Sequence, residues 1–127
     1  MLILYIAIGG ALGALVRYGL GHWIHSWAGN AFPWGTFAIN AIGSFALGLI
    51  LRYLDGTTDS PELRALLTVG FLGAFTTFST FTYETITLLQ HGSWTRATLY
   101  ALGSLFLGIL AVAAGLQVGA RILHPAS

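Results

Sequence analysis

The sequence has few charged residues and lacks two residue types altogether. Only 7% of its 127 residues are charged, against about 25% in soluble domains, and there is no lysine. Five basic and four acidic residues leave a net charge of +1, so the basic footprint of a nucleic-acid-binding protein is missing. There is no cysteine, which excludes disulfides and thiolate metal ligands. An ordinary soluble domain and a nucleic-acid partner are therefore excluded.

Motifs of known catalytic sites are missing too. The sequence has no nucleophile elbow, no metalloprotease helix motif, no phosphate-binding loop and no paired carboxylates. Glu84 is the one acid deep in a long apolar segment. One carboxyl group cannot form an acid/base pair, although it could serve a proton-coupled carrier. We therefore expect that the protein is not an enzyme.

The sequence is instead rich in apolar residues, with 56% hydrophobic residues and a mean hydropathy of +0.80. Four apolar segments cover about residues 2–24, 33–54, 62–89 and 97–123. Each reaches the roughly 20 residues that a membrane-spanning helix needs. No basic region precedes the first segment, so we interpret it as a retained span, not a signal peptide. The sequence predicts a single four-helix membrane domain over residues 1–127.

Small residues recur at spacings of four, a pattern that lets helix backbones approach closely in lipid. The pairs are Gly9 and Gly13, Ser44 and Gly48, Ser104 and Gly108, and Gly115 and Gly119. Four helices with such faces form a compact bundle with little interior. We therefore expect tight packing within the chain, and an oligomer if the protein encloses a pore.

The arginines divide almost evenly between the two ends of the predicted bundle. Arg52, Arg64 and Arg121 fall on the side of the termini, and Arg17 and Arg96 on the other. This split hardly selects an orientation under the positive-inside rule, so the chain can insert both ways and form an antiparallel dimer. Arg17 itself either extends to the membrane surface or pairs inside the bundle.

The third segment is too long for a straight helix. Its 28 residues would extend roughly 42 Å, whereas the hydrocarbon core is about 30 Å thick. Gly70 and Gly73 weaken the helix, so we predict a tilt or, near residues 73–77, a break. The carbonyl groups freed by a break either coordinate a cation or are bonded by hydroxyls and water.

Polar residues are concentrated just after these glycines. Eight of the twelve residues at positions 76–87 carry a hydroxyl. Asn40 lies about two turns inside the second segment, and Tyr100 and Ser104 lie one turn apart on the fourth. Lipid does not hydrogen-bond such groups, so they either bond neighbouring helices or line a path for a ligand.

Two phenylalanines stand among these hydroxyls. Phe78 and Phe81 are three residues apart, and the edge of a phenyl ring is electropositive. Ring edges and hydroxyls together would hold a dehydrated anion without a fixed positive charge that traps it. The alternative is that both rings only pack or contact lipid.

Histidine and tryptophan side chains gather around the first connection. His22, Trp23, His25, Trp27 and Trp34 suit the aromatic belt at a membrane surface. Metal binding by the two histidines is the alternative.

Three motifs of this sequence resemble the signatures of the Fluc, or CrcB, fluoride channels. They are GGALGALVRY at 9–18, PWGTFAINAIGSF at 33–45 and GFLGAFTTFSTF at 70–81. The resemblance implies an antiparallel, dual-topology homodimer with two pores in the bacterial inner membrane. It also implies passive, selective export of fluoride, which protects the cell from fluoride toxicity.

The resemblance further implies roles for individual residues. The ion pathway would include Asn40, Phe78, Phe81, Tyr100, Ser104, Thr77, Ser79 and Glu84. The backbone carbonyls of Gly73 and Thr76 would hold a structural sodium ion on the dimer axis, and Arg17 would lie in a vestibule. Two departures are Ala74, where members of the family often carry a second glycine, and Gly108, where some members carry a hydroxyl.

Two other classes compete with a channel. A small proton-coupled multidrug exporter also has four spans, but it needs an acid in the first segment, where this chain has only Arg17. A non-transporting assembly subunit would explain the glycines but not the dense hydroxyls beside the phenylalanines.

Overall fold

The computed structural model describes residues 1–57 and 59–124, and its regular elements are all helices. Four helical stretches are long and apolar enough to cross a membrane: Leu2–Ala28, Trp34–Thr57, Pro61–Gln90 and Trp94–Leu123. The prediction of four spans is therefore confirmed. Some helices extend three or four residues beyond the predicted segments, because helical hydrogen bonding continues through interfacial residues where the apolar pattern has already stopped.

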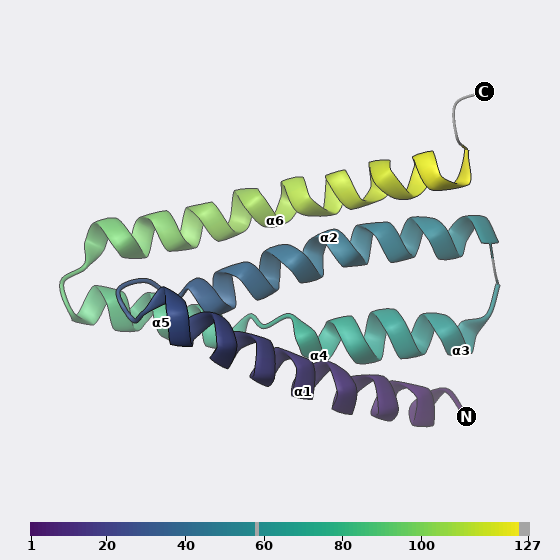
Figure 1. The fold of residues 1–127 in the computed structure, drawn as a ribbon, viewed down its shortest axis with the longest axis horizontal. Helices are drawn as coiled ribbons and strands as arrows, with labels where there is room; N and C mark the ends of the chain where they lie inside the picture. The colour runs from purple at the N-terminus through teal and green to yellow at the C-terminus, as the bar shows by residue number, and fades with distance from the viewer. Residues whose placement is uncertain (58, 125–127) are drawn as a thin grey trace.

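The first, second and fourth spans are the unbroken helices α1 (Leu2–Ala28), α2 (Trp34–Thr57) and α6 (Trp94–Leu123). The start of α1, the end of α2, the start of α3 and the end of α6 lie at one end of the molecule, and the α1–α2 and α5–α6 connections lie at the other (Figure 1). This is the arrangement that four consecutive membrane crossings require.

The third span is built from four pieces. They are α3 (Pro61–Arg64), a π-helix η1 (Ala65–Leu72), the short α4 (Gly73–Phe75) and α5 (Ser79–Gln90). The helix is interrupted at residues 76–78, where Thr76 has an extended backbone with ψ of 155°. The interruption therefore lies at the C-terminal side of the predicted range, residues 73–77. Gly73 itself is helical, with φ of −60° and ψ of −37°.

Helix α1 packs closely against the first half of the third span through glycines. A Cβ atom added at Gly9 would collide with the carbonyl oxygen of Leu66, and one added at Gly13 with that of Phe71. Gly70 of the third span makes the same close approach to α1, since an added Cβ would lie 2.7 Å from the Ile6 carbonyl oxygen. The small-residue pattern of the first segment therefore forms a helix–helix contact, as predicted.

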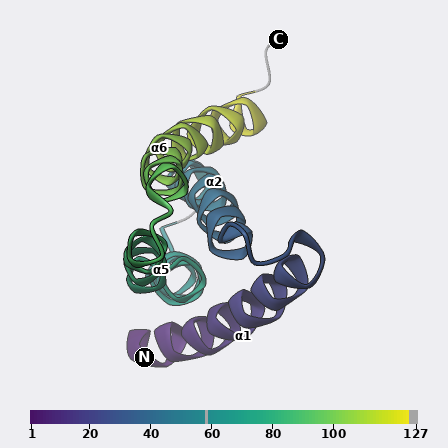
Figure 2. The same ribbon diagram turned by 90° about the vertical axis from the view of Figure 1, so that its left-hand side faces the viewer.

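Helices α2 and α6 form the second tight pair. Added Cβ atoms at Gly48 and Gly115 would collide with the carbonyl oxygens of Val112 and Phe45, respectively. The end-on view shows α2 between α6 and α1, with α5 below α6 (Figure 2). The first half of the third span contacts α1, whereas α5 contacts α6. The interruption at 76–78 is therefore the point where the third span stops packing against α1 and begins to pack against α6.

A small buried core lies beside the interruption. Ile39, Leu72 and Phe75 form this core and are nearly inaccessible. Many other large apolar side chains of α1 and α6 are exposed on the surface of the chain. Such a surface suits lipid or a second protein chain rather than water.

Candidate functional site

Asn40 of α2 binds the interrupted backbone directly. Its Nδ2 donates to the Thr77 carbonyl oxygen at 3.0 Å, and its Oδ1 accepts from the Thr77 N–H at 2.8 Å. The side-chain amide thus replaces the helical partners that Thr77 has lost. An amide nitrogen carries two hydrogens, so one N–H of Asn40 remains for a ligand. Of the two roles open to Asn40, the interhelical bond is confirmed.

The bond from Thr77 to Asn40 leaves backbone carbonyls without their helical donors. Among the hydrogen bonds of the described residues, none reaches the carbonyl oxygens of residues 73–76. Thr76 donates both its N–H and its hydroxyl to the Leu72 carbonyl oxygen instead. Gly73 lies on the surface of the chain and Thr76 is half-buried. A group of carbonyls without hydrogen-bond donors among the described residues therefore lies at the interruption.

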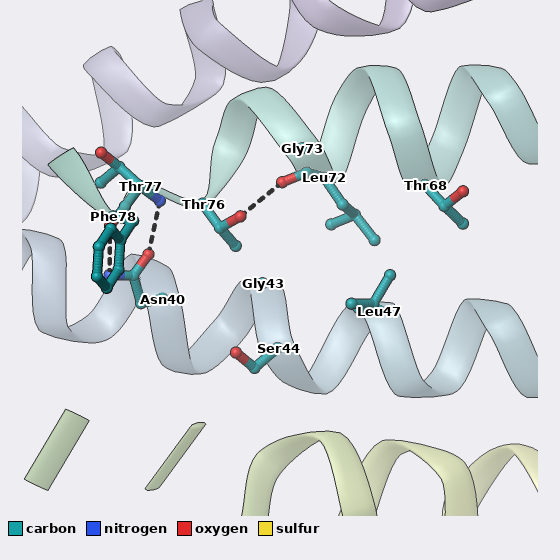
Figure 3. A pocket seen from close by; sticks show the side chains of 10 residues that line it. All are labelled: Asn40, Gly43, Ser44, Leu47, Thr68, Leu72, Gly73, Thr76, Thr77 and Phe78. Atoms are coloured by element: carbon teal, nitrogen blue, oxygen red, sulfur yellow. Dashed lines mark hydrogen bonds between the residues drawn. The ribbon is translucent and has the colours of Figure 1, made fainter. Parts of the chain in front are cut away.

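A cavity of about 300 Å³ opens between α2 and the third span beside these carbonyls. Figure 3 shows Asn40, Thr77 and Phe78 at one end of the cavity and Leu47 and Thr68 at the other. The cavity is also lined by Gly43, Ser44, Leu72, Gly73 and Thr76. None of the residues that line it is charged, so a ligand there would meet neutral dipoles and one aromatic ring.

Glu84 of α5 is held by two hydroxyl groups from other spans. Tyr100 of α6 donates to Oε2 at 2.6 Å, and Thr36 of α2 donates to Oε1 at 2.9 Å. Tyr100 is fully buried and Thr36 nearly so, whereas Glu84 is half-buried. The predicted residues Glu84 and Tyr100 are thus brought together. Thr36 was missed, although it lies one turn before Asn40 on the same face of α2.

The two phenylalanines connect these polar groups. The ring centroids of Phe78 and Phe81 are 5.9 Å apart, and those of Phe81 and Tyr100 are 5.1 Å apart. Phe78 is the residue before α5 and Phe81 lies within it, and the two rings are neighbours. The side chain of Phe78 is 77% exposed. A large ring so exposed beside a cavity is available to contact a ligand or a second chain.

Ser104 of α6 carries an orphaned hydroxyl. Its Oγ is buried and has no hydrogen-bond partner among the described residues, which is unusual for a buried polar atom. One turn further along α6, a Cβ at Gly108 would lie 3.7 Å from the Ser44 hydroxyl oxygen. The Ser44 hydroxyl of α2 therefore lies opposite Gly108, where α6 has no side chain of its own.

Most other hydroxyls of the third span bond their own helix. Thr82, Thr85 and Thr87 donate to carbonyl oxygens of the preceding turn. This arrangement satisfies hydroxyls inside a membrane helix without a ligand. Ser79 is exposed at the start of α5, and Arg17 is half-buried on α1. Neither residue lines the cavities beside Asn40 and Glu84.

A second polar cavity, of about 280 Å³, opens at the other side of Glu84. It is lined by Tyr18, Gly21, His22, His25, Pro33, Gly35, Thr36 and Glu84. The sequence predicted that the two histidines belong to an interfacial belt. It could not predict that α1 and α5 would bring them to the same cavity as Glu84. Among the described residues, no group of three or more histidine, cysteine or acidic side chains could hold a metal ion.

Four apolar spans, one of them interrupted beside a cavity lined by uncharged residues, define a multi-pass helical membrane protein. A family model described as "CrcB-like protein, Camphor Resistance (CrcB)" matches residues 4–116, and the chain belongs to this family. The family resemblance drawn from the three sequence motifs is therefore confirmed.

Several similar proteins carry the name "Fluoride-specific ion channel FluC". The one from Acidobacterium capsulatum is 54% identical over 124 residues, which cover 97% of this chain and 99% of the relative. The relative from Thermus thermophilus is 52% identical over 94% of each chain. The relative from Magnetococcus marinus is 49% identical and covers 96% of this chain and 100% of its own.

Proposed function

We propose that this chain forms a fluoride-selective ion channel, not an enzyme, which exports fluoride passively and protects the cell from fluoride toxicity. The names of relatives about half identical over almost the whole chain support this function. The observation that carries it is the exposed Phe78 ring at the rim of an uncharged cavity, beside an Asn40 amide with a spare N–H. Neutral donors and positive ring edges can replace the hydration shell of a small anion and still release it.

The functional unit is an antiparallel homodimer of dual topology. Phe78 and Gly73 are both exposed on the surface of the chain, so one chain does not enclose a path. A second copy would cover both features. The near-even distribution of arginines supports insertion in both orientations, and lipid would surround the remaining apolar surface.

The ion pathway uses the polar groups around the interruption. We assign Asn40, Phe78, Phe81, Tyr100, Ser104, Thr77, Ser79 and Glu84 to it, with Arg17 in a vestibule. The orphaned Ser104 hydroxyl supports this assignment, because a passing anion would supply the acceptor that it lacks. Tyr100 connects the ring of Phe81 to the Glu84 carboxyl group at the far end of the same path.

A structural sodium ion on the dimer axis would be held by the carbonyls of Gly73 and Thr76. The donor set fits, since these oxygens lack hydrogen-bond donors among the described residues. A two-fold axis doubles two carbonyls to four, and hard monovalent cations prefer such oxygens. Sodium should therefore raise the melting temperature of the detergent-solubilised dimer relative to an equal concentration of N-methylglucamine. Equal melting temperatures would remove the ion from the proposal.

Efflux from proteoliposomes tests the function. A fluoride electrode should record rapid fluoride release that needs no pH gradient, and chloride release should be nearly absent. Comparable chloride and fluoride fluxes would refute the selectivity. Fluoride release that requires a proton gradient would instead favour a coupled carrier. The multidrug-exporter alternative is not favoured, because α1 contains no acidic residue.

A further inference from the structure

Two cavities reach Glu84 at the end of the molecule where α1 and α2 connect. The cavity of about 280 Å³ is lined by His22, His25 and Glu84, among others. A neighbouring cavity of about 210 Å³ is lined by His25, Asn30 and Glu84, among others. His25 and Glu84 thus line both cavities, and the two histidines are exposed. Both approaches to the Glu84 carboxyl group run beside His25.

The carboxyl group that lines these cavities opposes the entry of an anion. An anion that enters here meets the Glu84 carboxyl group, which repels it when ionised. Among the described residues that line the two cavities, only His22 and His25 can become cations. Arg17 lines neither cavity. Histidine is the side chain whose charge ordinarily changes between about pH 5 and 8, so the potential at this mouth depends on the imidazoles.

We propose that His22 and His25 form an anion-entry site that captures fluoride when they are protonated. The proposal deepens the channel function and rests on it. The two imidazolium groups offset the Glu84 charge and donate N–H groups to the anion at the mouth. Fluoride entry through this mouth therefore increases as the solution on its side becomes more acidic.

Other titratable groups face this site from the elements packed around it. Tyr18 on α1 stacks on His22 with ring centroids 6.3 Å apart. Helix α5 contributes Tyr83 and Glu84, while the lining residues of α2 include no titratable group. Tyr100 of α6 contacts the site through its bond to Glu84. His91, which follows α5, bonds the carbonyl oxygen of Thr87, a lining residue of one cavity. Protonation of Glu84, the one carboxyl group among these groups, would favour an anion in the same direction, so the test removes the two histidines and keeps Glu84.

Fluoride efflux from proteoliposomes at about pH 8 and pH 6 tests the site. We expect the flux of the wild-type protein to rise about two- to fivefold in acid, the effect of one charge about 4 Å away in water. The double variant His22→Gln and His25→Gln should lose the rise. His124→Gln, a histidine that lines neither cavity, should keep it. Protein-free liposomes correct for the leak of undissociated hydrogen fluoride.

A rise that persists in the double variant, or a wild-type flux that does not change with pH, would overturn the proposal. Imidazole resonances of the solubilised protein provide a readout that needs no transport. Fluoride should shift the His22 and His25 resonances at about pH 6 but not at about pH 8, and should leave His124 unchanged.

The two readouts distinguish the ways in which the idea can fail. If the wild-type protein passes no fluoride at either pH, the channel function fails, and the resonances still decide whether the site exists. If fluoride flux is high but neither histidine resonance responds to fluoride, the entry site is wrong and the channel function stands. Size-exclusion chromatography at equal protein amounts confirms that the variants are folded.

Discussion

Asn40 is predicted to determine the stability of the interrupted span. Replacing it with leucine keeps the volume of the side chain but removes both hydrogen bonds to Thr77, at 3.0 and 2.8 Å. The Thr77 N–H and carbonyl groups then lose their partners in a half-buried position. An unsatisfied buried polar group costs about 1–3 kcal/mol. Because water reaches part of this site, we expect Asn40→Leu to lower the free energy of unfolding by about 2–4 kcal/mol.

Thermal melting in detergent, followed by the loss of the folded peak in size-exclusion chromatography, measures this change. A loss of this size lowers the melting temperature by on the order of 10 °C. Asn40→Asp retains the acceptor for the Thr77 N–H but places a second carboxyl oxygen against the Thr77 carbonyl oxygen, so it should also lower the melting temperature. Ser44→Ala is the matched control, because Ser44 lies one turn further along α2 and lines the same cavity.

If Asn40→Leu melts at the same temperature as Ser44→Ala and the wild-type protein, the amide does not hold the interruption. The open carbonyls of residues 73–76 would then need another explanation, and the proposed sodium site would lose its basis.

Three further outcomes are expected. Phe78→Ile or Phe81→Ile should reduce fluoride flux at least about tenfold at equal amounts of dimer, since isoleucine provides bulk without a positive ring edge; flux within a factor of two of wild type would leave only packing. Gly115→Ala should disrupt the α2–α6 contact and reduce the yield of folded dimer, whereas Gly19→Ala should be tolerated, because an added Cβ meets nothing within 4 Å; equal yields would contradict the packing argument. Two or three arginines added to the α2–α3 connection should fix one orientation and reduce function when that variant is expressed alone. C-terminal reporters on the wild-type chain should mark both sides of the membrane. Wild-type reporters on one side alone would refute dual insertion.

The sequence predicted the membrane spans well because their cause is local. A run of about 20 apolar residues satisfies its backbone within one helix and its side chains in lipid, whatever its neighbours do. The glycines that pack α1 against the third span were also visible, since a small-residue spacing of four is a property of one helix. Helix ends were less well predicted, because residues such as His25 and Trp27 continue α1 beyond its apolar segment.

The position of the interruption was only partly predictable. Gly73 reduced the stability of the helix in the sequence, yet it is helical, and the chain leaves the helix at Thr76. The deciding partner is the amide of Asn40, which is 37 residues away from Thr77 in sequence. Glycine lowers the cost of a break along a whole turn, but a bond from another span selects the residue at which it occurs.

The amino-acid pattern alone establishes that this chain crosses a membrane four times and that its third span is unsuited to a continuous helix. It also supplied the polar residues, because hydroxyls and an amide in apolar segments need partners wherever they lie. The tertiary structure alone decided which partners they found. It joined Glu84 to Tyr100 and Thr36, left the Ser104 hydroxyl without a partner among the described residues, and placed His25 beside Glu84. The reason is physical: hydropathy acts along one helix, whereas a hydrogen bond or a cavity depends on the rotation and depth of several helices packed together.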